Sequence, residues 1–226
     1  MKVNFGMMLV DAVGKLGGQC VQSNHYGRFA RTIVKPANPF STYSAAVRAS
    51  FKAISQKWQT ITPTQQAAWI AATRDYPRTD DFGNVYYMSG YDLYMSLNRN
   101  IVTVGFSMIA NPPTKVIPSD TGLFTLTCNP AGPSLITNYV NAQGQTNGWL
   151  LYYCTYKLST GISYVSSRYR LVKIIQCTGQ TSNEIGTDYV VKFSSFPTGQ
   201  RVFVKVICIN KVSGSASISN AAFIDV

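Results

Sequence analysis

A proline-rich tract near the middle of the chain separates two stretches whose apolar residues follow different periods. The tract, Ala110–Thr114, contains two adjacent prolines, which exclude a continuous helix or a central strand. Before it, apolar residues recur at helical spacings of three and four, whereas after it they alternate as in strands. The sequence therefore predicts one domain over residues 1–110 and a second over residues 111–226.

The helical part of the first domain begins near Ser41. Beyond this residue, apolar side chains recur at spacings of four, three and four, which is the pattern of a helix with one buried face. The side chains of this stripe are Val47, Phe51, Ile54 and Trp58. We expect the stripe to face the core of the domain.

A second helix is marked by its first four residues. Thr62 is an N-cap residue, Pro63 occupies the first helical position and Gln65 the third, which together form a capping box. The helix is rich in alanine, so another helix can approach it closely. We expect its Trp69 to pack together with Trp58 between the two helices.

A third helix is predicted to start at Ser89. The Ser89 side chain is the expected N-cap, and Asp92 lies near the positive end of the helix dipole. Gly105 is placed to end the helix. The buried stripe of this helix is expected to consist of Leu93, Leu97 and Ile101.

A short arm precedes the helices. Its segment Gly14–Gly18 is punctuated by glycine and is predicted to be flexible. Gln19–Gln22 and Gly27–Val34 are β-prone and flank polar residues, a pattern that predicts a hairpin. The first domain is therefore predicted to be α+β, with a β-hairpin arm and about three helices.

The second domain is predicted to be an all-β sandwich. Alternating apolar residues are separated by turn residues over about 110 positions, which is typical of a Greek-key sandwich. Trp149 occupies a position where such sandwiches place a core aromatic residue. The expected strands are Thr114–Ile117, Gly122–Cys128, Gly148–Tyr156, Arg168–Cys177, Asp188–Phe193, Gln200–Asn210 and Ala216–Val226.

The distribution of charge points to an anionic partner. The net charge is +11, and residues 12–74 contain no acidic side chain but eight basic ones. A stretch of one sign and this length indicates nucleic acid or an acidic protein surface as the partner, with a solvated basic face as the alternative. The candidate contacts are Lys15, Arg28, Arg31, Lys35, Arg48 and Lys52.

Side chains that catalysis requires are scarce. His25 is the one histidine, and no carboxylate lies within residues 12–74 to orient it. The Asp80-Asp81 pair stands beside Gly83, as solvated turn residues do. No metal-ligand spacing or phosphate-binding glycine motif is present. We therefore predict that the chain is not an enzyme and binds no cofactor or metal.

The cysteines and the apolar runs indicate a protein made in the cytosol. No apolar run approaches the length needed to span a bilayer, so we expect no membrane partner. The cysteines are widely spaced and are expected to be reduced, with a disulfide in the second domain as an alternative. They are Cys20, Cys128, Cys154, Cys177 and Cys208.

The end of the chain resembles a fibronectin type III domain. The resemblance rests on the run Val202–Asn210, the turn Ser213-Gly214-Ser215 and a final strand that ends at Val226. The sequence departs from that family where Val202 replaces a common tyrosine. The resemblance implies an immunoglobulin-like sandwich, and another sandwich topology stays open.

The first 105 residues resemble a family of uncharacterised proteins from tailed-phage genomes and from bacterial genomes that carry phage-type genes. The shared features are short motifs together with Trp58 and Trp69. The resemblance implies a virion-associated structural role without residue assignments. The motifs are Gly14–Gly18, Gly27, Arg31, Pro36–Pro39 and Ser89–Tyr94 followed by Leu97-Asn98.

Three functions are therefore compared. The first is a bacteriophage virion subunit, at the capsid, connector or tail, made in the host cytoplasm. It would assemble with itself and other virion proteins through the arm and helices, and contact packaged DNA without sequence preference. The alternative is a nucleic-acid-binding protein that uses residues 12–74, where Tyr26, Phe29 and Tyr43 are interleaved with cations. A surface adhesin is the third hypothesis.

Overall fold

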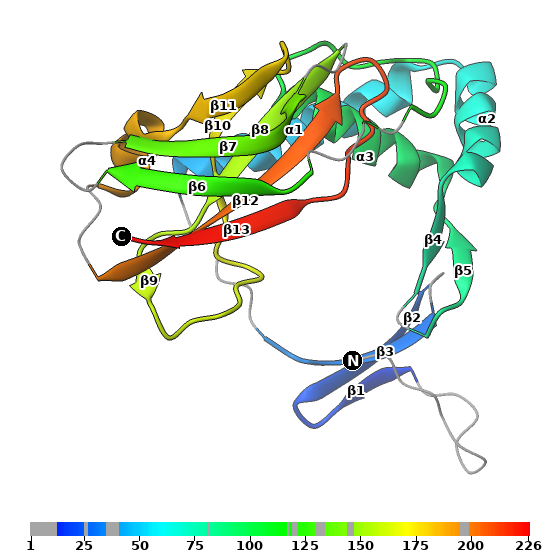
Figure 1. Cartoon of the computed structure of the whole chain (residues 1–226). Helices are drawn as coiled ribbons and strands as arrows, with labels where there is room; N and C mark the ends of the chain where they lie inside the picture. The colour runs from blue at the N-terminus through cyan, green and yellow to red at the C-terminus, as the bar shows by residue number, and fades with distance from the viewer. Residues whose placement is uncertain are drawn as a thin grey trace. The chain divides into compact units, whose positions relative to one another are not determined.

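The computed structural model describes residues 13–24, 27–34, 41–80, 82–116, 118, 122–129, 134–143, 147–194 and 199–226. The chain divides into two compact units, Met1–Ala45 and Ala46–Val226, and this division falls inside the first helix. The fold is mixed α/β, and the strand pairs of the described residues are antiparallel (Figure 1).

The first unit contains a three-stranded sheet, which we call the arm sheet. Its strands, in spatial order, are β1 (Gly14–Leu16), β2 (Gln19–Asn24) and β3 (Gly27–Thr32). The predicted hairpin is β2–β3, and its expected tip at His25 and Tyr26 lies outside the described residues. The segment Gly14–Gly18, predicted to be flexible, instead forms β1 and a tight turn. Gly17 allows this turn because its φ of +57° is left-handed.

The three predicted helices are confirmed together with their caps. In the capping box, the Gln65 N–H donates to Thr62 Oγ1 at 3.3 Å and the Thr62 N–H donates to Gln65 Oε1 at 3.0 Å. The Asp92 N–H donates to Ser89 Oγ at 3.1 Å. Gly105, with a φ of +91°, follows the third helix. The helices are α1 (Thr42–Thr60), α2 (Pro63–Ala72) and α3 (Gly90–Thr103).

Tyr94 of α3 joins the helices into one core. Its ring centroid lies 5.0 Å from that of Trp58 and 5.2 Å from that of Trp69. Trp69 is fully buried, and Trp58 is half-buried. The two tryptophans therefore pack on a shared tyrosine, which the prediction of a tryptophan pair did not include. Gly90 lets α3 approach α2, because a Cβ there would lie 2.9 Å from the backbone nitrogen of Ile70.

The predicted stripe of α1 is buried only in part. Ile54 is fully buried, as expected, whereas Phe51 is 43% exposed, which corrects the prediction. The guanidinium of Arg99 lies 5.3 Å from the centroid of the Phe51 ring. A single side chain covers this ring less completely than the face of a neighbouring helix would.

A short hairpin connects α2 and α3. It follows a 3₁₀ turn, η1 (Thr73–Asp75), and consists of β4 (Pro77–Thr79) and β5 (Val85–Tyr87). Asp80 builds its turn, since Oδ1 accepts the backbone N–H groups of Phe82 and Asn84 at 2.9 Å each.

Two further sheets form most of the second unit (Figure 1). One has the order β11-β7-β6 and the other the order β10-β8-β12-β13, with β9 paired to β12. The strands are β6 (Phe124–Asn129), β7 (Ser134–Gln143), β8 (Gly148–Cys154), β9 (Leu158–Ser159), β10 (Arg170–Gln176), β11 (Gln180–Glu184), β12 (Gln200–Asn210) and β13 (Asn220–Asp225).

Side chains from both sheets share one apolar core. Leu135 and Tyr139 come from β7, and Leu150 and Tyr152 come from β8. The hydroxyl oxygens of Tyr139 and Tyr152 lie 2.6 Å apart and link the two sheets. The predicted alternation of β12 is confirmed, because one set of its side chains lies in this core. That set is Val202, Val204, Val206 and Cys208.

The observed elements differ from the predicted strands in five places. Residues Asp188–Phe193, predicted as a strand, belong to the helix α4 (Gly186–Phe193). Thr114–Val116 is not a strand, and Ile117 lies outside the described residues. The strands β7, β9 and β11 are absent from the prediction. The helix forms because Ile185, Tyr189 and Phe193 recur every fourth residue, so the first two turns bury one face.

The proline-rich tract is anchored to the helices. The buried Asn98 side chain accepts the Ile109 N–H at 2.7 Å, and Trp69 Nε1 donates to the Ala110 carbonyl at 2.8 Å. The helices and the two larger sheets therefore belong to one compact unit. A domain boundary between residues 110 and 111 stays a prediction.

Trp149 lies on the face of β8 that points away from the core between the sheets. Its neighbours Leu150 and Tyr152 belong to that core, whereas Trp149 packs with Val104 and Ile209. Its ring centroid lies 5.4 Å from that of Phe106. Trp149 is therefore a packing residue, but at a different place from the predicted one.

Candidate functional site

Lys15 and Arg31 project from the same face of the arm sheet. The register pairs Lys15 with Cys20 and Cys20 with Arg31, so these residues stand side by side across the three strands. Directly opposed residues of antiparallel strands share a face. Cys20 is buried, whereas Lys15 and Arg31 are exposed. Two of the predicted contacts thus flank one buried thiol.

Arg28 projects from the opposite face of the arm sheet. It lies three residues before Arg31 on the same strand, and side chains alternate between faces. Its partner in the register is Ser23, and its side chain is half-buried. The arm therefore carries positive charge on both faces.

Arg48 and Lys52 lie one turn apart on α1 and are exposed. Both belong to the second unit, whereas Lys15, Arg28 and Arg31 belong to the first. Lys35 lies outside the described residues. The predicted contacts therefore form two groups, one on the arm sheet and one on α1.

Arg99 is a further cation near Arg48 and Lys52 of α1, and the sequence analysis did not identify it. It comes from α3, and its guanidinium lies 5.3 Å from the centroid of Phe51, which follows Arg48 by three residues on α1. No local signal could have indicated this pairing, because the two residues of the contact lie on different helices. Positive charge and an exposed aromatic ring thus occur together on this surface.

Several acidic side chains already have partners within the chain. Asp188 lies 2.8 Å from Lys173 Nζ, and Asp225 lies 2.6 Å from Arg201 Nε. Hydrogen bonds from Arg201 hold the pKa of Asp225 below its ordinary value. Glu184 accepts the Leu135 N–H at 3.0 Å. These three carboxylates are therefore engaged within the second unit.

The arm sheet buries very little apolar surface. Among residues 13–24 and 27–34, with the side chains of 16 and 24 left aside, Cys20 is the one buried residue, at 7% exposure. The apolar side chains that flank the strands are exposed: Val13 by 70%, Ile33 by 45% and Val34 by 73%. A sheet of three strands needs a covered hydrophobic face for independent stability. The arm sheet therefore has a packing requirement that its own side chains do not meet.

The residues with catalytic potential are used structurally where they are described. The described part of the chain contains no group of three or more His, Cys, Asp or Glu side chains that could hold a metal ion. Asp80 builds a turn, and Asp81 lies outside the described residues, as does His25. The five cysteines are not joined in disulfides. Burial raises the pKa of the Cys154 thiol to about 12, which keeps it protonated near neutral pH.

Comparisons with known proteins do not assign this chain to a family. No protein-family model matches the sequence, and no curated protein matches it either. Within the described residues, none of the helices combines the length and the apolar character that crossing a bilayer requires.

Proposed function

We propose that this chain is a structural subunit of a bacteriophage virion that assembles through its arm sheet. The observation that carries the proposal is the arm sheet itself, three strands in a compact unit that bury one described side chain, Cys20. Fixing each backbone residue costs about 1–2 kcal/mol of conformational entropy. Burial of one small side chain cannot offset that cost over three strands, so a neighbouring subunit is the expected cover.

The partner of the arm sheet is a second copy of this chain, with other virion proteins at the ends of the assembly. Strand pairing between subunits satisfies backbone groups without requiring charge complementarity. This mode suits a chain whose charged residues make up only 13% of its sequence. The exposed Val13, Ile33 and Val34 supply apolar surface next to the strands.

The cations of the arm have a separate role in this proposal. Lys15 and Arg31 share one face, while Asp188 and Asp225 of the second unit pair with Lys173 and Arg201. The anions that meet the arm therefore come from another virion protein or from packaged DNA. Under this proposal the protein resides in the virion after synthesis in the host cytoplasm and acts without catalysis.

The two larger sheets support a fibronectin type III-like sandwich as the second part of the proposal. The support is that two antiparallel sheets, β11-β7-β6 and β10-β8-β12-β13 with β9 paired to β12, share one apolar core. The helix α4 between β11 and β12 is an addition to the pattern. In this role the sandwich presents surface to neighbouring subunits or to the exterior.

The alternative is a nucleic-acid-binding protein, which the surface of α1 favours. Arg99 lies over the exposed ring of Phe51, Arg48 and Lys52 are exposed on the same helix as Phe51, and bases stack on such rings beside cations. If this is the function, the monomer binds single-stranded DNA with steep salt dependence. Loss of Arg48 and Lys52 then lowers the log–log salt slope by about 0.7 for each phosphate contact.

Sedimentation velocity of the full chain and of one variant tests the assembly proposal. Val21 lies on the central strand β2, paired to Gly14 and Ala30, so Val21→Pro removes a donor from the sheet. Wild-type protein is expected to form oligomers that this variant does not form. Val116→Pro, in an exposed segment outside helices and strands, is the matched control and is expected to assemble normally.

Two results would contradict the assembly proposal. One is a wild-type chain that stays monomeric up to about 100 μM, well above typical subunit affinities. The other is Val21→Pro assembling like wild type. Submicromolar binding of DNA by that monomer would favour the alternative.

A further inference from the structure

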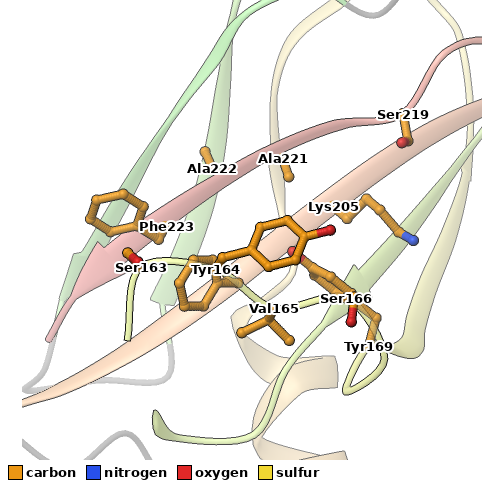
Figure 2. A pocket seen from close by; sticks show the side chains of 11 residues that line it. Ser163, Tyr164, Val165, Ser166, Tyr169, Lys205, Ser219, Ala221, Ala222 and Phe223 are labelled. Carbon is orange, nitrogen blue, oxygen red and sulfur yellow. The ribbon is translucent and has the colours of Figure 1, made fainter. Parts of the chain in front are cut away.

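A hollow of about 410 Å³ lies on the outer face of β12 and β13, beneath the loop 160–169 (Figure 2). Lys205 reaches it from β12, and Ala221 and Phe223 reach it from β13. Tyr164 and Ser166 come from the loop above. The hollow lies within the second unit and is distinct from the arm sheet.

The small side chain of Ala221 explains why the hollow is open. The register places Ala221 directly opposite Lys205, and Phe203 directly opposite Phe223, on the same face. A methyl group therefore stands between the large ring of Phe223 and the small side chain of Ser219. The loop is held above this gap because Arg201 Nη1 donates to the Ile162 carbonyl at 2.9 Å.

Lys205 supplies the one formal charge among the residues that line the hollow. Its ammonium lies 4.7 Å from the ring centroid of Tyr169 and 5.4 Å from that of Tyr153. Two tyrosine faces thus orient the ammonium without neutralising it, since a ring quadrupole attracts a cation but carries no net charge. The hollow therefore attracts an anion, and the two tyrosine rings fix the position of the Lys205 ammonium.

The rest of the lining combines hydroxyl groups with exposed aromatic rings. Ser163, Ser166 and Ser219 offer hydroxyls. The Tyr164 side chain is 79% exposed, whereas the Phe223 ring is 51% exposed and has the Arg201 guanidinium 4.1 Å from its centroid. The open ring of Tyr164 beside hydroxyls suits a ligand that has both C–H faces and hydroxyl edges.

We propose that this hollow binds an acidic saccharide, a pyranose that carries a carboxylate. The carboxylate meets the ammonium of Lys205, and the C–H face of the sugar ring packs on Tyr164. Serine hydroxyls exchange hydrogen bonds with the sugar hydroxyls. An apolar ligand would leave the ammonium and the hydroxyls without partners, which is costly. A bare inorganic anion would leave the aromatic rings uncovered.

Saturation-transfer NMR titrations of the full chain test the proposal. The probes are D-glucuronate, D-galacturonate and N-acetylneuraminate, with D-glucose, D-galactose and acetate as comparisons. At least one acidic sugar is expected to bind with a dissociation constant of about 1 mM, as suits an open site with a single ionic contact. Neutral sugars and acetate are expected to bind at least about tenfold more weakly.

Variants assign the binding to this hollow. Lys205→Met and Tyr164→Ala are each expected to weaken binding of the acidic sugar at least about tenfold. Lys211→Met is the matched control, because Lys211 also lies over an aromatic ring, Phe106 at 5.3 Å, but outside the hollow. Ala221→Leu fills the floor at an exposed position, so it blocks binding even if Lys205→Met lowers stability.

Three results would overturn this inference. They are no saturation transfer to any of the acidic sugars at about 10 mM, equal affinity for acetate, and wild-type affinity in both Tyr164→Ala and Ala221→Leu. None of these results bears on assembly, which depends on the arm sheet, so the two proposals fail separately.

Discussion

Gly214 is the position where one methyl group should cost the second unit most. It lies in the turn after β12 with a φ of +69°, and a Cβ built there would lie 2.4 Å from the carbonyl oxygen of Leu97 on α3. The same Cβ would lie 2.9 Å from the Leu97 carbonyl carbon. The obstacle is helix backbone, which cannot rotate away as a side chain can.

The loss for Gly214→Ala has two parts. A left-handed conformation costs an alanine about 1–2 kcal/mol, and overpacking against a fixed neighbour costs about 1–3 kcal/mol. We therefore expect a loss of unfolding free energy of about 2–5 kcal/mol. If the turn moves away from α3 to relieve the overlap, the 2.7 Å hydrogen bond from Asn100 Nδ2 to the Gly214 carbonyl is weakened as well.

Gly179→Ala is the matched control. Gly179 also has a left-handed φ, of +87°, but a Cβ there would meet nothing within 4 Å. This variant should lose only the conformational part, about 1–2 kcal/mol. Urea unfolding of both variants, followed by circular dichroism, measures the difference. Equal losses would refute the close packing of α3 against the β12 turn.

Three more predictions follow from the buried and paired groups. Trp69→Ala should lower the free energy of unfolding by about 3–5 kcal/mol, because a fully buried ring leaves a cavity; a loss below about 1 kcal/mol would contradict this. Because the pKa of Asp225 is lowered, its ion pair stabilises the fold above the ordinary aspartate pKa, and this contribution is lost as pH falls through the lowered value. NMR titration should show the Asp225 pKa rising toward about 3.9 in Arg201→Ala, and an unchanged pKa would exclude the pairing. In native protein, iodoacetamide should modify the buried Cys154 at least about tenfold more slowly than the half-buried Cys128, and equal rates would argue against this burial.

Features that depend on neighbouring residues in the sequence could be predicted well. The capping box at Thr62 and the N-cap at Ser89 are confirmed, because each cap and its partner lie three residues apart. The alternation of β12 is confirmed because its two faces meet different surroundings. By contrast, the predicted strand Asp188–Phe193 is part of α4, because the four-residue spacing of Tyr189 and Phe193 fits both an alternating strand and a helix.

Features that depend on distant residues could not be predicted. The contact between Gly214 and Leu97 and the aromatic pair around Lys205 join segments far apart in the chain. The candidate cations were found from composition, but their separation into an arm group and an α1 group required the structure. The position of Arg99 beside Phe51 depends on the packing of α3 with α1, which the sequence does not indicate.

Hydrogen exchange of the arm sheet tests most directly the claim that a neighbouring subunit covers it. The measurement compares peptides from Gly14–Thr32 with peptides from Gln200–Asn210, in dilute monomer and in assembled protein. We predict that assembly slows exchange in the arm at least about tenfold, while β12 is protected in both states. Equal protection of the arm in the monomer would contradict the account, because the sheet would then be stable without a partner.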